Sequence, residues 1–238
     1  MDTTSQSVRF DRGAAGLTMF RQGQGTMTFP EVTFVGPSVD DPELMVKLPA
    51  ALGDFLRETN GLVAGAGAFH LRGASQEPTW HSLRDAWEGP RSFQALYRAV
   101  HAEDVPFAEE ALGDQFLLRE GVVYRLDAET GDLVSLNLGF TQFMDAVAAD
   151  PLGALNLAPL RRFRSEGGSL QPGQLLSAYP PFCTKESGAG VSLGAIDTFD
   201  RRAFLAHFAQ QVAGVPDGGT SAYADEDLKG MVYKRLID

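Results

Sequence analysis

Apolar residues recur along this chain with two different periods, which predict helices in some stretches and strands in others. Between residues 48 and 61 one helical face collects the apolar side chains Leu48, Leu52, Phe55 and Leu56. Pro49 suits the first helical turn, and Asn60-Gly61 suits the end, because both of these last residues tolerate the left-handed conformation. The pattern therefore predicts an amphipathic helix packed on a core.

Three further stretches share this helical period, at residues 92–103, 139–151 and 201–214. Ser92 is a candidate N-cap for the first, and Pro151 is expected to end the second. We expect five residues to lie in the core, because each is on the inward-facing side of its predicted helix or strand: Leu52, Phe55, Phe116, Phe143 and Met144.

Strand patterns lie between these helices. Residues 115–119 and 122–126 flank Glu120-Gly121, a two-residue hairpin connection, and a third strand follows at residues 133–136. Shorter strands are expected within residues 66–73, 175–182 and 190–196, whereas residues 1–39 are expected to form an arm or edge strands. Helices alternating with an antiparallel meander predict an α+β fold.

Composition and net charge narrow the classes of partner and compartment that we expect for this chain. The chain has 238 residues with 20 basic and 31 acidic side chains, a formal net charge of −11. Such a charge argues against non-specific binding to nucleic acid or to an anionic membrane, and it suits a basic protein partner. One cysteine, no signal-peptide pattern and no membrane-spanning apolar run lead us to expect a cytoplasmic protein.

Candidate chemistry is sparse. The four histidines lack HxxxH spacing, the glycine-rich stretch GLVAGAGAF follows a predicted helix where a dinucleotide-binding loop should follow a strand, and no GxSxG is present. Cys183 with His207 is a remote candidate for a small hydrolase, set against a buried cysteine of no catalytic role. We therefore expect no catalytic residues, no metal and no cofactor.

Partner-binding candidates are better defined. Trp80 and Trp87 lie in the polar segment from residue 78 to 89, where they serve either as contact anchors or as core plugs. A second candidate surface is formed by the acidic side chains Glu103, Asp104, Glu109 and Glu110. The alternative for this second group is a solvated loop that keeps the protein soluble.

Three segments, in this order, resemble the SUKH superfamily, which includes yeast regulators of glucan synthesis and bacterial toxin-immunity proteins. They are LPAALGDFLRETNGL, VPFAEEALGDQFLL and GFTQFMDAVAADP, within about residues 40–151, with Gly139 where serine is usual. Residues 170–212 resemble the C-terminal domain of type VI secretion immunity proteins, with ESGAGVSLG in place of the usual Leu-Gly-Gly step.

The resemblance implies an antiparallel sheet packed against helices over residues 40–159, with an appended α/β subdomain over residues 160–238. It also implies a non-enzymatic protein that neutralises a secreted toxin, delivered by a type VI or contact-dependent system, by direct binding. An intracellular regulatory or scaffold module of the same fold is the alternative.

Overall fold

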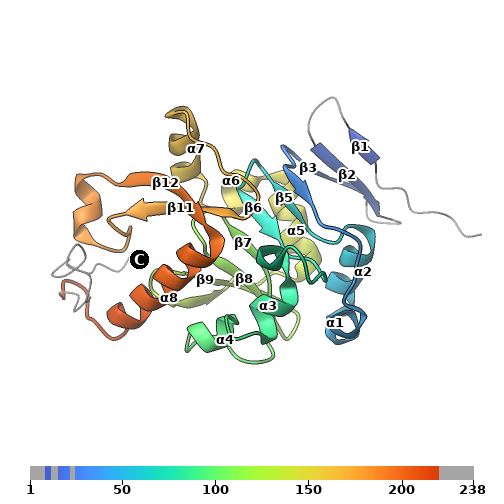
Figure 1. Cartoon of the computed structure of the whole chain (residues 1–238), viewed down its shortest axis with the longest axis horizontal. Coiled ribbons are helices and arrows are strands. Elements are labelled where there is room, and N and C mark those ends of the chain that lie inside the picture. The colour runs from blue at the N-terminus through green and yellow to red at the C-terminus, as the bar shows by residue number, and fades with distance from the viewer. Residues whose placement is uncertain (1–8, 12–15, 22–24, 220–238) are drawn as a thin grey trace, which may run out of the picture.

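The protein is described here from a computed structural model that covers residues 9–11, 16–21 and 25–219 (Figure 1). Within these residues an antiparallel sheet of seven strands dominates, in the spatial order β10-β9-β8-β7-β6-β5-β4. Its strands are β4 (Phe34–Val35), β5 (Leu62–Ala64), β6 (Phe69–Leu71), β7 (Val105–Glu110), β8 (Gln115–Arg119), β9 (Val122–Leu126) and β10 (Leu133–Ser135). Each strand pairs with its neighbour in sequence, so the sheet is one long meander, and the predicted α+β class is confirmed.

Both faces of this sheet are covered. Successive residues of a strand point to opposite faces, so Phe116 and Leu118 of β8 join one core while Leu117 joins another. The first core receives α1 (Pro42–Lys47), α2 (Ala50–Glu58) and α5 (Phe140–Ala149). The second receives α4 (Phe93–Leu96) and α8 (Thr198–Val212), and α8 crosses in front of the sheet in Figure 1.

Smaller elements complete the molecule. The N-terminal sheet, β1 (Arg9–Asp11), β2 (Gly16–Arg21) and β3 (Gly25–Phe29), adds Leu17, Met19 and Phe29 to the first core. After α5 come α6 (Pro151–Ala154) and α7 (Ala158–Ser165), then the hairpin of β11 (Gln174–Tyr179) and β12 (Ser192–Asp197). Two short 3₁₀ helices lie at Thr79–His81 and Lys185–Ala189, and α3 spans Leu83–Glu88.

Most of the predicted elements are present, with instructive differences. Glu120 and Gly121 both have positive φ, 50° and 82°, as a type I′ hairpin requires. The helix predicted at residues 92–103 is only the single turn α4, because its chain turns extended at Tyr97, whose hydroxyl donates to the Ala128 carbonyl. The helices α1, α3 and α7 were not predicted, since each is short and begins beside turn-forming residues.

The five residues expected in the core are there: Leu52, Phe55, Phe116, Phe143 and Met144 are each at most 1% exposed. Within the described part of the chain, no helix is long and apolar enough to cross a bilayer.

Replacing Phe55 by alanine should lower the free energy of unfolding by about 3–5 kcal/mol, because the ring is fully buried and its removal leaves a cavity. Urea unfolding followed by circular dichroism measures this. Val46→Ala on α1 is the control, since Val46 is 86% exposed. Equal stability in the two variants would mean that α2 does not pack on the sheet.

Candidate functional site

The second face of the sheet contains a buried ionic network around Glu109 of β7, a residue only 1% exposed. Arg202 of α8 binds both oxygens of this carboxylate, with Nη2–Oε1 at 2.6 Å and Nε–Oε2 at 3.0 Å. Arg72, which follows β6, reaches Oε2 at 3.0 Å and also donates to Gln115 of β8 at 2.6 Å. Burial favours the neutral acid, but Arg202 and Arg72 outweigh it and hold the pKa of Glu109 well below 4.5.

A histidine pair extends the network. His70 Nδ1 lies 2.9 Å from Glu109 Oε1, His70 Nε2 lies 2.9 Å from His81 Nδ1, and His81 Nε2 lies 2.9 Å from the carbonyl oxygen of Asn60. Burial lowers the pKa of His70 to about 4 and that of His81 to about 3, so both rings are neutral at pH 7.

Two neutral rings supply two N–H groups for these three contacts. The Asn60 carbonyl only accepts, so His81 Nε2 carries one proton, and the negative Glu109 carboxylate favours the other proton on His70 Nδ1. His70 Nε2 and His81 Nδ1, which face each other, are then both without a proton. A hydrogen bond between these two atoms therefore needs a third proton. Sequence spacing does not indicate this pair, because the two histidines are eleven positions apart with a loop between them.

The predicted acidic surface over residues 103–110 is wrong for three of its four members. Asp104, Glu109 and Glu110 are each 1% exposed, and only Glu103 is exposed. Arg119 binds both oxygens of Asp104, at 2.7 and 2.6 Å, and Arg125 binds Glu110 at 2.9 Å. Because β7 is buried on both faces, its carboxylates point into internal arginine partners and away from water.

Both tryptophans make internal contacts. Trp80 is partly buried against Phe34, at 4.8 Å between ring centroids, and against His70, at 5.0 Å, so it covers the histidine pair. Trp87 packs on the first core and its indole N–H donates to the Ala102 carbonyl at 2.8 Å. Trp87 therefore packs on the first core and Trp80 on Phe34 and the histidines, and a role of either side chain in partner binding stays a prediction.

Cys183 is fully buried, and its backbone N–H donates to Glu129 at 2.8 Å. Burial, followed by the neighbouring Glu129 carboxylate, raises the pKa of the thiol far above its usual range. A thiol in this state is a poor nucleophile, so the proposed Cys183–His207 pairing has no support in the geometry of this cysteine.

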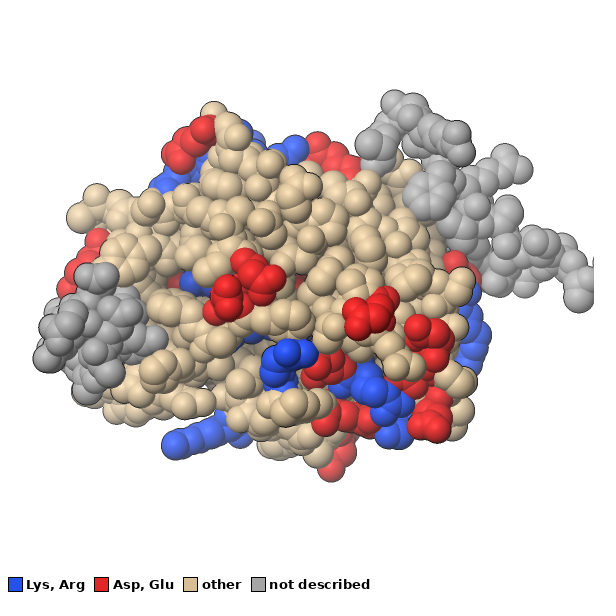
Figure 2. Space-filling view, viewed as in Figure 1, with Lys and Arg blue, Asp and Glu red and all other residues tan. Residues whose placement is uncertain are grey.

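A pocket of about 370 Å³ lies where the β7–β8 turn, the β9–β10 turn and α8 meet. Among the described residues its charged walls are Asp114, Asp127, Glu129, Asp132, Arg125 and Arg201. Figure 2 shows red and blue side chains intermingled at the lower right of the visible face. Arg84, for example, pairs with both Asp41 and Glu88. In the pocket, by contrast, the carboxylates that line the walls outnumber the guanidinium groups.

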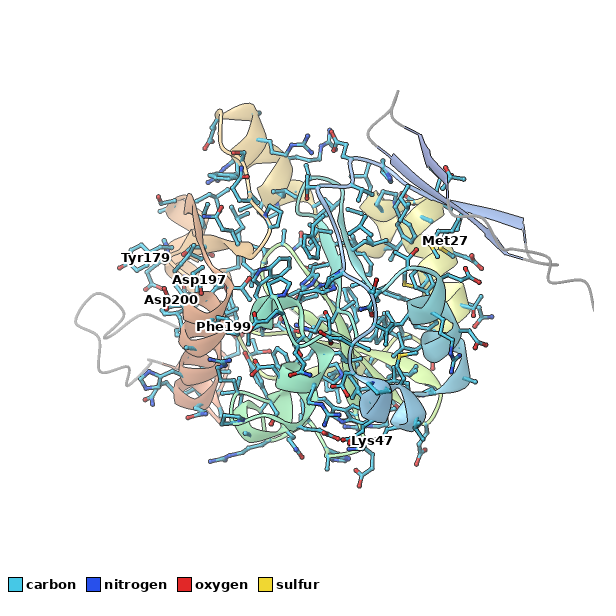
Figure 3. All side chains as sticks on the ribbon, turned by 45° about the vertical axis from the view of Figure 1, so that its right-hand side comes forward. Met27, Lys47, Tyr179, Asp197, Phe199 and Asp200 are labelled. Atoms are coloured by element: carbon cyan, nitrogen blue, oxygen red, sulfur yellow. The ribbon has the colours of Figure 1, made fainter. Side chains whose placement is uncertain are left out.

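The spacing of apolar residues after Arg201 places this arginine on the buried face of its predicted helix. Arg201 lies in helical phase with the apolar residues Leu205, Phe208 and Val212, four, seven and eleven positions on. A charged residue on the buried face of a helix indicates an internal partner. Phe199, labelled in Figure 3 at the start of α8, also anchors this helix, because the Arg91 guanidinium lies 4.2 Å from its ring centroid.

Comparison with known proteins gives limited help. No protein-family model matches the chain, and no curated protein matches it. Among solved structures it is similar to the crystal structure of Atu4351 from Agrobacterium tumefaciens, with 14% identity over 75% of this chain and 84% of that chain and a TM-score of 0.49. This similarity is too distant to define a family.

Replacing Glu109 by glutamine should lower the free energy of unfolding by about 3–5 kcal/mol, because Arg72 and Arg202 stay buried without their counter-charge. Chemical unfolding at pH 7 measures the change. Asp54→Asn is the matched control, because its ion pair with Arg57 is exposed and such pairs contribute about 0–1 kcal/mol. A similar small loss in both variants would contradict the structural role of Glu109.

The contribution of Glu110 to the free energy of unfolding should change with pH in the opposite direction to that of Glu109. Burial, and then the Asp114 carboxylate, raises the pKa of Glu110 from 4.5 to about 7. Its protonated form favours folding, so this contribution is present below pH 4.5 and is lost as the pH rises through 7. Between pH 5 and 8, Glu110→Gln should gain stability relative to the native chain by on the order of 2–3 kcal/mol.

Urea unfolding at four pH values over this range measures the difference, and Glu103→Gln is the exposed control. The same pH trend in both variants would show that Glu110 is not the group responsible.

Proposed function

We propose that this chain is a non-enzymatic immunity protein of the SUKH type, which acts in the cytoplasm and neutralises a secreted bacterial toxin by binding it. The observation that carries the proposal is that the three segments resembling the SUKH superfamily meet in one core. Phe55 of α2 contacts Phe140 of α5 at 5.8 Å between ring centroids. Phe143 of α5 contacts Phe107 of β7 at 5.7 Å and Phe116 of β8 at 4.6 Å.

This common core matters because each motif alone is short. Segments that are far apart in the sequence contribute their apolar faces to the same contacts, in agreement with the fold that the resemblance implies. In the appended segment β11 pairs with β12, and α8 packs on the seven-stranded sheet of the preceding segment.

The state of the reactive groups favours binding over catalysis. The Glu109 carboxylate already accepts from Arg72, Arg202 and Gln115, so it has little capacity to act as a general base. The Cys183 thiol is buried. The net charge of −11 favours encounter with a basic partner and disfavours nucleic acid, the substrate of many toxins.

The test is co-production with the product of a toxin-like gene adjacent to the gene for this chain. The toxin alone should arrest growth, this chain should restore growth, and the two purified proteins should elute together. Their association rate should fall about tenfold or more between low and high salt, because a net charge steers the encounter.

Glu103→Lys, the exposed acid of the predicted surface, and Trp80→Ala test the predicted contacts, with Asp145→Asn on α5 as a surface control. Growth arrest that this chain does not relieve, with no complex formed, would refute the immunity role. Turnover of a substrate that is lost in Cys183→Ala would establish the hydrolase alternative.

A further inference from the structure

A slot with apolar walls, about 240 Å³ in volume, opens where the β3–β4 turn and the β5–β6 turn meet the helices α5, α6 and α7 (Figure 1). Its walls include the buried side chains Phe29, Phe69, Val147, Leu155 and Leu160. Leu152 of α6 also lines this apolar slot, yet 57% of its surface is exposed. A large exposed apolar side chain beside an apolar slot extends the surface available to a ligand.

One cation at the rim of the apolar slot has no counter-charge. Glu31 is paired with Arg164 through both carboxylate oxygens, each at 2.9 Å. Arg161, three positions earlier on α7, is exposed, and its guanidinium has no hydrogen bond or ion pair within residues 9–11, 16–21 and 25–219. The charged residues of the slot therefore leave a surplus of one positive charge, in a chain whose net charge is −11.

The two turns beside the slot are held in a strained conformation. Glu31 and Ala66 have positive φ, 46° and 51°, which is uncommon for residues other than glycine. The Gly65 N–H donates to the Pro30 carbonyl at 2.9 Å and the Ala66 N–H donates to the Glu31 carbonyl at 3.0 Å, so the two turns are fixed to each other. Backbone strain that the surrounding structure maintains is typical of ligand sites, and here these bonds fix one wall of the slot.

From these features we infer that the apolar slot binds a free carboxylic acid with an unbranched apolar chain, whose carboxylate pairs with Arg161. An apolar cavity of about 150 Å³ holds one benzene ring, so by proportion a slot of 240 Å³ holds a chain of roughly eight to ten carbon atoms. The guanidinium group suits the head of such a ligand, because it donates two parallel hydrogen bonds to a carboxylate. This inference goes beyond the proposed function and does not depend on it.

The size and charge of the slot favour a free acid over two larger partners. A membrane phospholipid has two long chains, which exceed the volume of the slot, and an anionic membrane repels a chain of net charge −11. The terminal residue of a partner protein would bring one side chain, such as that of leucine. This side chain would leave much of the slot empty, and an unfilled void forfeits packing contacts.

The first test is a chain-length series. Calorimetric titration of the native chain with hexanoate, octanoate, decanoate and tetradecanoate, each below the concentration at which it forms micelles, measures the dissociation constants. Octanoate should bind about tenfold more tightly than hexanoate, because two more methylene groups are buried. Tetradecanoate should gain nothing over decanoate, because the slot is then full. Octan-1-ol is the neutral control and should bind at least about fivefold more weakly than octanoate.

Two exposed positions at the rim provide variants that leave the core intact. Arg161→Gln should weaken octanoate binding about fivefold and leave octan-1-ol binding unchanged, whereas Arg57→Gln on α2 should change neither. Leu152→Glu should weaken octanoate binding more than its neutral counterpart Leu152→Gln, because a like charge then faces the carboxylate. Circular dichroism and melting temperature of each variant should match those of the native chain, since these side chains are exposed.

Backbone NMR signals show where the ligand lies. Octanoate should shift the signals of Gly65, Ala68 and Leu157, which line the slot, in a saturable way. Shifts confined to other residues, equal affinity for octanoate and octan-1-ol, or an affinity that does not change with chain length would overturn the inference. Tighter binding of the peptide acetyl-Gly-Gly-Leu than of octanoate would overturn the choice of ligand in favour of a protein C-terminus. Binding to phosphatidylglycerol vesicles with no binding of the free acids would overturn it in favour of a membrane surface.

Discussion

The buried carboxylate of Glu109 is the interaction on which the relation between the sheet and α8 depends. It accepts hydrogen bonds from Arg72, Arg202 and Gln115, which come from three different parts of the chain. Two guanidinium groups share one buried carboxylate, so none of the three charges is stable there without the others. The contact of Arg202 with both oxygens of Glu109 joins α8 to β7 of the sheet.

The histidine pair extends this constraint to the other end of the fold. Asn60, at the end of α2, accepts from His81 through its carbonyl, while its side chain accepts from Ala74 N–H at 2.7 Å and donates to the Pro37 carbonyl at 2.9 Å. Asn60, two residues beyond the last residue of α2, is therefore a junction between three loops. Polar contacts join Asn60 to His81 and His70 through Glu109 to Arg202 of α8, and the two histidines face each other at 2.9 Å between these two sets.

The apolar framework could be predicted from sequence and this polar network could not. Phe55 and Phe143 are in the core, as the helical periodicity predicts. Phe116 is also in the core, but its strand is buried on both faces, so periodicity does not select one side there. Periodicity does not reveal which charges meet: Glu109 and Arg202 are 93 residues apart. The acids near residue 109 were expected at the surface because most carboxylates are exposed, a rule that fails in a strand covered on both faces.

The docking of α8 and the acidic pocket are consequences of the same two residues. Arg201 and Arg202 are adjacent, so the bidentate pair that fixes Arg202 on Glu109 also sets the position of Arg201 beside Glu129. Successive helical residues point about 100° apart, which directs one guanidinium into the network and the other into the pocket.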